Sequence, residues 1–364
     1  MKILELHYST SWAGAERFVV DLCNELVEQE DVVLCTIIDD RIPEMGYYKN
    51  ELKSKIKYIN LRCQSGLQIK SLWRIYKTIR KEKPDIIHAH TDVICIFLPA
   101  LLYNKAIYFH TLHSLANVCL RKKILKPIYK WFYKTRITPI TISNACSESF
   151  QELYKENYSI KINNGRAPLK ETIHINDVQQ EIQSLKLHSD DKVFIHVARC
   201  QPEKNQKLLI ESFNLFLQNN YHGILLLIGA SYDKIENKYL LDMAKKGIYW
   251  LGLKNNVCDY LKQSDFFILS SKYEGLPISL LEAMSCGVIP ICTPAGGIPN
   301  VINNKKYGYI SHDFTCEEFY KTIKEAFNDY NQFDKKGLID YFNENYSMKN
   351  CAEHYLETFK KSMR

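Results

Sequence analysis

The sequence has little glycine and proline and no long hydrophobic run. Its 364 residues include only 14 Gly and 11 Pro, which excludes collagen-like and low-complexity classes. The longest uncharged apolar run, residues 93–103, contains Pro99 and falls far short of the roughly 20 residues that span a membrane. The first residues also lack the apolar core of a signal peptide. We therefore expect a soluble, cytoplasmic protein with one large domain or two ordinary ones.

The twelve cysteines follow no metal or disulfide pattern. They are scattered from Cys23 to Cys351, with no CxxC pair and no matching histidine cluster. The spacing therefore indicates neither a zinc site nor a disulfide framework. We expect reduced thiols, most of them buried.

The net charge of +7 belongs to one half of the chain. Residues 1–170 hold 26 Lys and Arg against 17 Asp and Glu, a net of +9, whereas residues 171–364 hold 22 against 24, a net of −2. Such asymmetry indicates an anionic partner for the N-terminal half: nucleic acid, a membrane surface or a phosphorylated substrate.

Short apolar segments alternate with helix-like patterns through both halves. The predicted strands cover residues 3–7, 32–38, 85–90, 107–111, 138–142, 192–198, 223–228, 248–251, 266–269 and 288–292. The predicted helices cover residues 16–28, 69–81, 145–154, 207–217, 239–246, 257–263, 278–285 and 350–361. This alternation is typical of parallel sheets covered by helices on both faces.

A polar stretch, residues 163–191, separates two such series. We therefore predict an α/β protein with two doubly wound, Rossmann-like parallel-sheet domains, over residues 1–168 and 169–345. The last segment, residues 346–364, is expected to be a helix that could pack back on the N-terminal domain. Ligands of such sheets bind at the carboxyl ends of the strands, so two facing domains would place these ends across a cleft.

One candidate ligand loop, residues 11–17, follows the first predicted strand and opens the first helix. Gly14 lets the backbone approach a ligand, and the helix N-terminus offers free N–H groups to a phosphate. The loop lacks GxGxxG, so a dinucleotide site of that type is not supported, and a purely structural turn is an equal alternative.

A stronger candidate has two carboxylates eight residues apart, Glu274 before a predicted helix and Glu282 within it. A helical glutamate among apolar neighbours is costly to bury unless a partner satisfies it, and ribose or hexose hydroxyls are suitable donors. Gly275, Leu276 and Ser279 would supply backbone or hydroxyl contacts at the helix start. The alternative is an exposed glutamate followed by one that stabilises the helix dipole, and this segment alone does not separate the two.

Residues 274–282 resemble the E-x7-E motif of retaining glycosyltransferases of the GT-4 type, which have the GT-B fold. Further segments match the same family in the same order, from about residue 3 to residue 312. They are residues 13–17, 84–91, 109–114, 142–143, 164–165, 196–199, 203–206, 250–252, 264–265, 270–271, 287–290 and 295–297. The resemblance implies a GT-B enzyme that transfers a sugar, with two Rossmann-like domains facing across a cleft.

The resemblance also implies how the donor phosphates would be bound. Arg199 and Lys204 would pair with the diphosphate of a nucleotide sugar and stabilise the phosphate leaving group electrostatically, without a metal. Gly14 would bring its backbone to the same diphosphate from the other domain. Consistently, the sequence contains no DxD, the metal–phosphate signature of the other glycosyltransferase fold.

For the rest of the donor, the resemblance places Glu282 at the nucleotide ribose and Glu274 at the transferred sugar. Gly252 and Lys254 would lie near the base.

Four histidines of the N-terminal half are candidates for the site. His113 matches the active-site histidine of the family, where it could orient a donor hydroxyl or support positive charge at the anomeric centre; His110 is the competing candidate. His88 and His90 alternate on a predicted strand, so both point to one face. A two-histidine metal site there is conceivable but has no third ligand nearby, so we expect structural or cleft-lining roles and no bound metal.

Three positions depart from the family pattern. Ala13 stands where a second glycine is common, Arg166 stands in place of an aliphatic residue after Asn-Gly, and Asn300 stands where glutamate is frequent. None of them removes a donor residue, but Arg166 changes a segment where the family pattern implies an interdomain contact.

Residues 119–136 contain seven basic residues and no acid, interleaved with aromatic and aliphatic side chains. Such a mixture suits the headgroup layer of an anionic membrane or an anionic acceptor. The candidate residues are Arg121, Lys122, Lys123, Lys126, Lys130, Trp131 and Lys134. The alternatives are a solvated helix whose aromatics pack into the core and, without any accompanying motif, a nucleic-acid site.

We therefore expect a cytoplasmic, peripheral membrane enzyme that needs no cofactor. It would move a hexose, with retention, from a nucleoside diphosphate sugar to a lipid-linked or growing glycan acceptor in surface polysaccharide biosynthesis. UDP is the family-level expectation for the nucleotide, and nucleic acid is not expected as a partner. The alternatives are a soluble GT-B enzyme that makes a small glycoside and a non-catalytic subunit that binds a sugar nucleotide.

Overall fold

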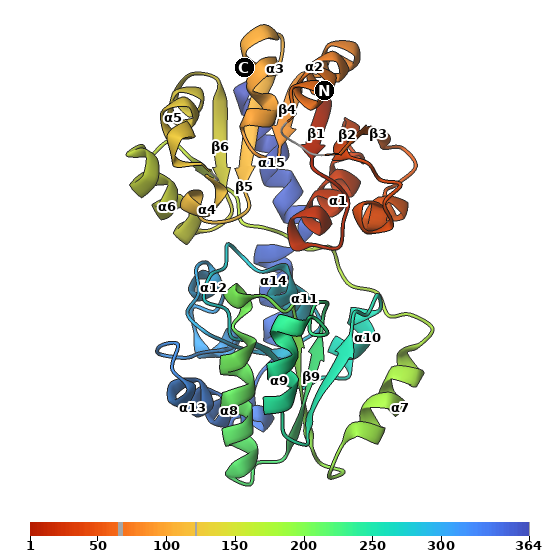
Figure 1. Ribbon diagram of the computed structural model, residues 1–364, viewed down its shortest axis with the longest axis vertical. Coiled ribbons are helices and arrows are strands. Elements are labelled where there is room, and N and C mark those ends of the chain that lie inside the picture. Colours follow the sequence, from red (N-terminus) through yellow and green to blue (C-terminus); the bar gives the residue numbers. More distant parts are fainter. Residues whose placement is uncertain (65–67, 121, 364) are drawn as a thin grey trace. The chain divides into compact units, whose positions relative to one another are not determined.

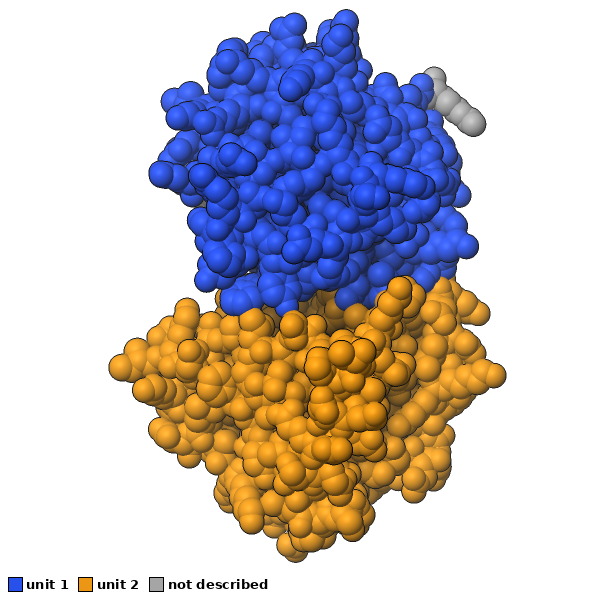
Figure 2. Space-filling view, turned by 90° about the vertical axis from the view of Figure 1, so that its right-hand side faces the viewer, with its two compact units in different colours: residues 1–167, 346–364 blue, residues 168–345 orange. Residues whose placement is uncertain are grey.

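The computed structural model describes residues 1–64, 68–120 and 122–363, and the chain divides into two compact units. The first contains Met1–Ala167 and Tyr346–Arg364, and the second contains Pro168–Asn345 (Figures 1 and 2). The predicted C-terminal domain, residues 169–345, differs from the second unit by one residue. The chain therefore leaves the first unit once and returns to it for its last helix.

The first unit is built on a seven-stranded parallel sheet with the order β3-β2-β1-β4-β5-β6-β7. The strands are β1 (Lys2–His7), β2 (Asp31–Ile38), β3 (Lys57–Cys63), β4 (Ile86–Ala89), β5 (Ile107–Leu112), β6 (Ile137–Thr141) and β7 (Ile160–Lys161). The strand order reverses at β1 and β4, which is the doubly wound topology. The two edge strands, β3 and β7, are not among the predicted strands.

Helices cover both faces of this sheet. They are α1 (Gly14–Leu26), α2 (Ile69–Glu82), α3 (Ile94–Leu102), α4 (Ala116–Cys119), α5 (Lys126–Thr135), α6 (Asn144–Tyr154) and α15 (Met348–Ser362). The C-terminal helix α15 packs beside α1 on the sheet of the first unit (Figure 1). Its Tyr355 and Phe359 rings contact His88 and Phe109 of the sheet, which ties the end of the chain to its beginning.

The second unit repeats the architecture with a six-stranded parallel sheet, in the order β10-β9-β8-β11-β12-β13. The strands are β8 (Lys192–Val197), β9 (Gly223–Ile228), β10 (Ile248–Gly252), β11 (Phe266–Leu269), β12 (Ile289–Cys292) and β13 (Tyr309–Ile310). These strands are buried and rich in Ile, Leu and Phe because helices cover both faces. The predicted fold class, two Rossmann-like α/β domains, is confirmed.

The second unit has eight α-helices among its described residues, and α7 is among those that were not predicted, because its sequence is polar. They are α7 (Ile175–Leu185), α8 (Gln206–Gln218), α9 (Lys238–Met243), α10 (Val257–Lys262), α11 (Ile278–Ser285), α12 (Ile298–Val301), α13 (Cys316–Asn328) and α14 (Lys335–Tyr346). Helix α7 lies within the polar stretch that the sequence marks as a boundary, since only Val178 and Ile182 of it are buried. The prediction for residues 239–246 is too long, because α9 ends at Met243.

Two further findings bear on the class of protein. Within residues 1–64, 68–120 and 122–363, no helix has both the length and the apolar character needed to cross a bilayer. The cysteines are free thiols and most are buried, as the sequence predicts.

Candidate active site

In the second unit, Glu274 is at the centre of a compact polar cluster in the loop after β11. Its Oε1 accepts hydrogen bonds from Lys204 Nζ and from Ser271 Oγ, each at 2.6 Å. Glu274 is buried, whereas the Lys204 side chain keeps 22% of its surface exposed. Both bonds use the same carboxylate oxygen, so Oε2 is engaged by neither of them.

Hydrogen bonds to backbone carbonyl groups hold the loops after β8 and β11 together, and so bring Lys204 to Glu274. Ser270 Oγ donates to the carbonyl oxygens of Lys204 and Asn205, at 2.9 and 3.0 Å, and Lys272 N donates to Glu203 O at 2.8 Å. Because these parallel strands are adjacent in the sheet, their carboxyl ends meet at one edge. Apart from the place of Ser270 and Ser271 in the family pattern, nothing in the sequence indicates these contacts.

A third loop, after β12, packs against the backbone of Glu274. Thr293 Oγ1 donates to Ser271 O at 2.6 Å. Gly296 has a φ of +53°, and a Cβ added to it would lie 1.7 Å from Glu274 O. Only glycine fits both the conformation and the space, so this residue fixes the position of the glutamate.

Helix α11 begins four residues after Glu274 and carries the second carboxylate of the pair. Gly275 and Leu276 are buried in the turn before the helix, and Ser279 and Glu282 are half-buried within it. The two glutamates therefore belong to one loop–helix element, and the helix N-terminus offers N–H groups to an anion.

Arg199 follows β8 and is exposed. In the described part of the chain its guanidinium has no carboxylate partner. Its carbonyl accepts a hydrogen bond from Gln206 Nε2 at 2.9 Å, and Gln206 lies 3.3 Å from His196 Nε2. Burial lowers the pKa of His196 to about 4, so the ring is neutral. Its Nδ1 donates to Ile268 O at 2.8 Å, which joins this loop to β11.

The segment predicted to lie near the base is already engaged within the unit. Gly252 ends β10 with a φ of +73°. Lys254 Nζ lies 3.5 Å from Glu181 Oε1 of α7 and 5.0 Å from the centre of the Tyr260 ring. A ligand that used Lys254 would have to compete with Glu181.

In the first unit, Gly14 is exposed and is the first residue of α1. Glu16, two residues later, accepts a hydrogen bond from Ser11 Oγ at 3.2 Å and lies 3.6 Å from His7 Nε2. Burial raises the pKa of Glu16, but the interactions with His7 and Ser11 outweigh it and the net shift is downward. An ionised carboxylate thus holds the Gly14 loop against the end of β1.

His113 and His110 have different surroundings. His110 is buried, its Nε2 lies 2.6 Å from Thr91 O and its Nδ1 accepts from Tyr133 OH at 2.8 Å, so both ring nitrogens are occupied. Burial lowers its pKa to about 4. His113 is half-buried and has its Nε2 2.8 Å from His90 Nδ1. The two rings thus differ, because both nitrogens of His110 are engaged whereas the contact of His113 with His90 is made through Nε2.

The expectation that His88 and His90 have no third potential metal ligand nearby is wrong. Glu5 of β1, far away in the sequence, places its Oε2 2.9 Å from His88 Nδ1 and 2.7 Å from His90 Nε2. The contact with His90 is a hydrogen bond and the contact with His88 is at ion-pair distance, while His88 Nε2 lies 2.7 Å from Thr111 Oγ1. Period-two alternation could have placed Glu5 on this face once β1 and β4 were known to be neighbours.

The basic segment forms α5 and the turns before it, with two distinct faces. Tyr129, Phe132 and Tyr133 are buried against the sheet, while Ile124, Ile128 and Trp131 are 81%, 43% and 49% exposed. The solvated-helix alternative therefore holds for one face only. Of the basic residues, Lys122, Lys123 and Lys134 are exposed, Lys126 and Lys130 are half-buried, and Arg121 lies outside the described residues. Lys130 is paired with Glu156 at 3.2 Å.

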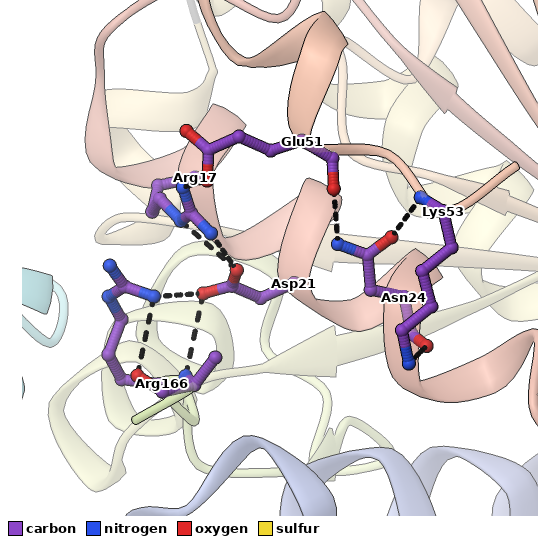
Figure 3. Close-up of polar contacts among 7 residues, drawn as sticks. Arg17, Asp21, Asn24, Glu51, Lys53 and Arg166 are labelled. Atoms are coloured by element: carbon purple, nitrogen blue, oxygen red, sulfur yellow. Dashed lines mark hydrogen bonds and ion pairs between the residues drawn. The ribbon is translucent and has the colours of Figure 1, made fainter. Parts of the chain in front are cut away.

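Arg166, one of the departures from the family pattern, is a buried residue of the first unit. It forms an ion pair with Asp21 of α1, which also accepts from Arg17 (Figure 3). Its backbone pairs with the returning chain, since Arg166 N donates to Tyr346 O and Met348 N donates to Arg166 O. The two segments that connect the units are thus joined to each other and to the helix that begins at Gly14.

Two family models match the chain in succession. Residues 12–164 match the model described as Glycosyltransferase Family 4, and residues 177–338 match Glycosyl transferases group 1. A UDP-Gal:alpha-D-GlcNAc-diphosphoundecaprenol alpha-1,3-galactosyltransferase of Escherichia coli is 29% identical over 276 residues, 72% of this chain and 71% of its own. The capsular polysaccharide biosynthesis glycosyltransferase CapH of Staphylococcus aureus is 22% identical over 92% of this chain and 95% of its own.

A solved structure shares the fold over nearly the whole length. The Anabaena protein Alr3699/HepE, in complex with UDP and glucose, has a TM-score of 0.82 at 18% identity and covers 99% of this chain and all of its own.

Proposed function

Because the chain belongs to the glycosyltransferases of family 4 and group 1, a GT-B family, we propose that it moves a hexose from a UDP-sugar to a lipid-linked glycan acceptor. The transfer retains the anomeric configuration and needs no metal. The enzyme works in the cytoplasm at the inner face of a membrane, in the synthesis of a surface polysaccharide.

The observation that carries the donor half of this proposal is the Lys204–Glu274–Ser271 cluster at the carboxyl ends of β8 and β11. It holds a lysine and a carboxylate at the sheet edge where ligands of such folds bind. A buried carboxylate with one oxygen outside these two hydrogen bonds suits the hydroxyls of a sugar, and Lys204 and the exposed Arg199 suit its diphosphate. UDP is chosen because the Escherichia coli relative is named for UDP-Gal and the Anabaena protein was solved with UDP.

In this mechanism, the fixed positive charges of two side chains would stabilise the leaving diphosphate in place of a metal ion. As the bond between the sugar and the diphosphate lengthens, negative charge grows on the leaving oxygen, and Lys204 and Arg199 would stabilise it. In a retaining reaction on one face, that oxygen would then take the proton of the acceptor hydroxyl. Glu274, held by two hydrogen bonds, would position the sugar and would not attack it.

The acceptor half rests on α5 and on the named relatives. Three apolar side chains are exposed beside exposed lysines on this segment, which suits an anionic headgroup layer. Each lysine near such a surface contributes about 1 kcal/mol. The Escherichia coli relative is named for an acceptor on diphosphoundecaprenol.

The donor is tested with purified protein and a panel of UDP-, GDP- and ADP-sugars. A bound donor raises the melting temperature by mass action, and we expect UDP-sugars alone to do so. Glu274→Gln should still bind UDP but lose transfer, while Lys204→Met should lose both. The anomer of the product, assigned by NMR, checks retention, and an inverted configuration contradicts the mechanism.

The acceptor is tested by flotation with vesicles of neutral or anionic lipid. We expect binding only with anionic lipid, and its loss in the double variant Lys122→Glu/Lys123→Glu. The matched control is Lys130→Gln, whose lysine is already paired with Glu156. Equal binding to both lipids, or none, would favour a soluble enzyme that makes a small glycoside.

A further inference from the structure

Three polar side chains, one in a strand and two just after the ends of neighbouring strands, form a line on one face of the first sheet. Glu5 lies within β1, His90 directly follows β4 and His113 directly follows β5. On β1 and β4 the alternate residues, such as Leu6 and Ala89, pack into the apolar core on the opposite face. The pleat of adjacent parallel strands therefore gathers the polar side chains on the face that α15 covers.

The hydrogen bonds along this line have one consistent direction. Glu5 is fully buried; burial raises its pKa, but His88 and His90 more than offset this and bring it to about 2. The carboxylate is therefore ionised at neutral pH and can only accept. Since Glu5 Oε2 lies 2.7 Å from His90 Nε2, that nitrogen must carry the proton.

The proton on His90 Nε2 then determines the state of His113. Burial, together with His88, lowers the pKa of His90 to about 3, so the ring is neutral and its Nδ1 is an acceptor. His113 Nε2, 2.8 Å away, must donate to it. Burial and the neighbouring His90 also keep His113 neutral by lowering its pKa. A neutral ring that is protonated at Nε2 has its lone pair at Nδ1.

We propose that Glu5 and His90 are positioning residues that fix the tautomer of His113, so that its Nδ1 accepts a hydrogen bond from a hydroxyl of the bound sugar. This inference rests on the proposed sugar transfer for its functional part. We call the Glu5–His90–His113 chain the relay. The Glu5 carboxylate at one end determines the tautomer of His90, and His90 in turn makes Nδ1 of His113, at the other end, a hydrogen-bond acceptor. His7 and His88 face the same line, but His88 Nε2 is bonded to Thr111 Oγ1 and His7 Nε2 lies 3.6 Å from Glu16 Oε1.

The chain offers a variant that should reverse the relay and a matched control. In Glu5→Gln the side chain keeps its size but its amide can donate to His90 Nε2, which moves the His90 proton to Nδ1 and the lone pair of His113 to Nε2. Tyr355→Phe removes a hydroxyl that lies 3.1 Å from Thr111 Oγ1 on the same buried face. It leaves the three members of the line in place, so it should change nothing at His113.

The tautomers are measured with ¹⁵N-labelled histidine by long-range ¹H–¹⁵N correlation, with His113 assigned from His113→Gln. We expect an unprotonated Nδ1 at His113 in the wild type and in Tyr355→Phe, and a protonated Nδ1 in Glu5→Gln. A wild-type His113 unprotonated at Nε2 overturns the proposal even if Glu5→Gln does not fold. An unchanged tautomer in a folded Glu5→Gln does so as well.

Turnover of the UDP-sugar tests the functional part separately. Glu5→Gln should lower kcat by roughly 10- to 100-fold, the range for one polar group left without its partner, with UDP affinity unchanged. If Glu5→Gln reverses the tautomer of His113 and still has the turnover of the wild type, the tautomer of His113 does not matter for transfer and the proposal is refuted. If the wild type itself transfers no sugar, the proposed function fails, and the spectra still decide on the relay.

Discussion

At α1, one buried carboxylate, Asp21, is paired with two arginines. Asp21 accepts a hydrogen bond from Arg17 Nε at 3.0 Å and is paired with Arg166, which anchors the connecting segment (Figure 3). The side chains of Asp21, Arg166 and Arg17 are 1%, 6% and 12% exposed. Two guanidinium groups thus pair with one carboxylate that water hardly reaches, and Arg17 also pairs with Glu51. The pKa of Arg17 is raised, because Asp21 and Glu51 outweigh the effect of burial.

Asp21→Asn removes the charge and keeps the shape. Breaking a buried ion pair from one side costs about 3–5 kcal/mol, since the partner is left buried and uncompensated. Glu51→Gln is the matched control: it pairs with the same Arg17, but its side chain is 48% exposed, and exposed pairs contribute about 0–1 kcal/mol. For a unit of this size, 3 kcal/mol corresponds to a melting temperature lower by about 6–12 °C.

Urea unfolding followed by tryptophan fluorescence is a suitable assay, because Trp12, Trp73 and Trp131 lie in the first unit and only Trp250 lies in the second. We expect a large loss of stability for Asp21→Asn and a partial recovery in Asp21→Asn/Arg166→Gln, which removes the stranded charge. If Asp21→Asn and Glu51→Gln both cost less than about 1 kcal/mol, then Asp21 is effectively hydrated and the reasoning from burial fails.

Three further predictions concern the sites. Glu274→Gln should abolish sugar transfer while UDP still raises the melting temperature; wild-type kcat in this variant would contradict the role of the carboxylate. Burial lowers the pKa of His90 to about 3 and of His196 to about 4, so only the unfolded chain takes up their protons between pH 6.5 and 4. The free energy of unfolding should therefore decrease as the pH is lowered from 6.5 to 4, by about 1.4 kcal/mol per pH unit for each histidine. His196→Gln should reduce this pH dependence, which is measured by urea titrations. Gly296→Ala should displace Glu274 and lower activity more than tenfold, whereas Gly252→Ala, with open space around its Cβ, should cost only about 1–2 kcal/mol of left-handed strain. Equal effects of the two alanines would argue against Gly296 as a support.

Local patterns predict the central strands well, and they fail where burial is partial. Strands β9 and β11 and helix α11 have the predicted bounds, because a continuous apolar run between turns has few other uses. Strand β3 is different: it lies at the sheet edge, most of its residues are half-buried, and its polar residues mask the period. Helix α7 escapes notice for the same reason.

The candidate site divides in a similar way. Lys204, Glu274 and Glu282 could be named because they stand in an ordered motif. Glu5 could not, since a single glutamate in a strand gains its meaning only from His88 and His90, more than 80 residues away. Strand order, which brings β1 beside β4, is a long-range property that no local pattern contains.

The division of the first unit between the two ends of the chain has a consequence for biosynthesis. A ribosome releases residues 1–167 long before α15, yet Tyr355 and Phe359 of α15 cover His88 and Phe109 on the sheet. Until those residues emerge, the polar face that holds Glu5 is open to water and its hydrogen-bond chain is unprotected. The second unit, continuous in sequence, can complete its folding first. The first unit can therefore complete its folding only after the second unit has been synthesised, and its histidine chain can be covered only once α15 has emerged.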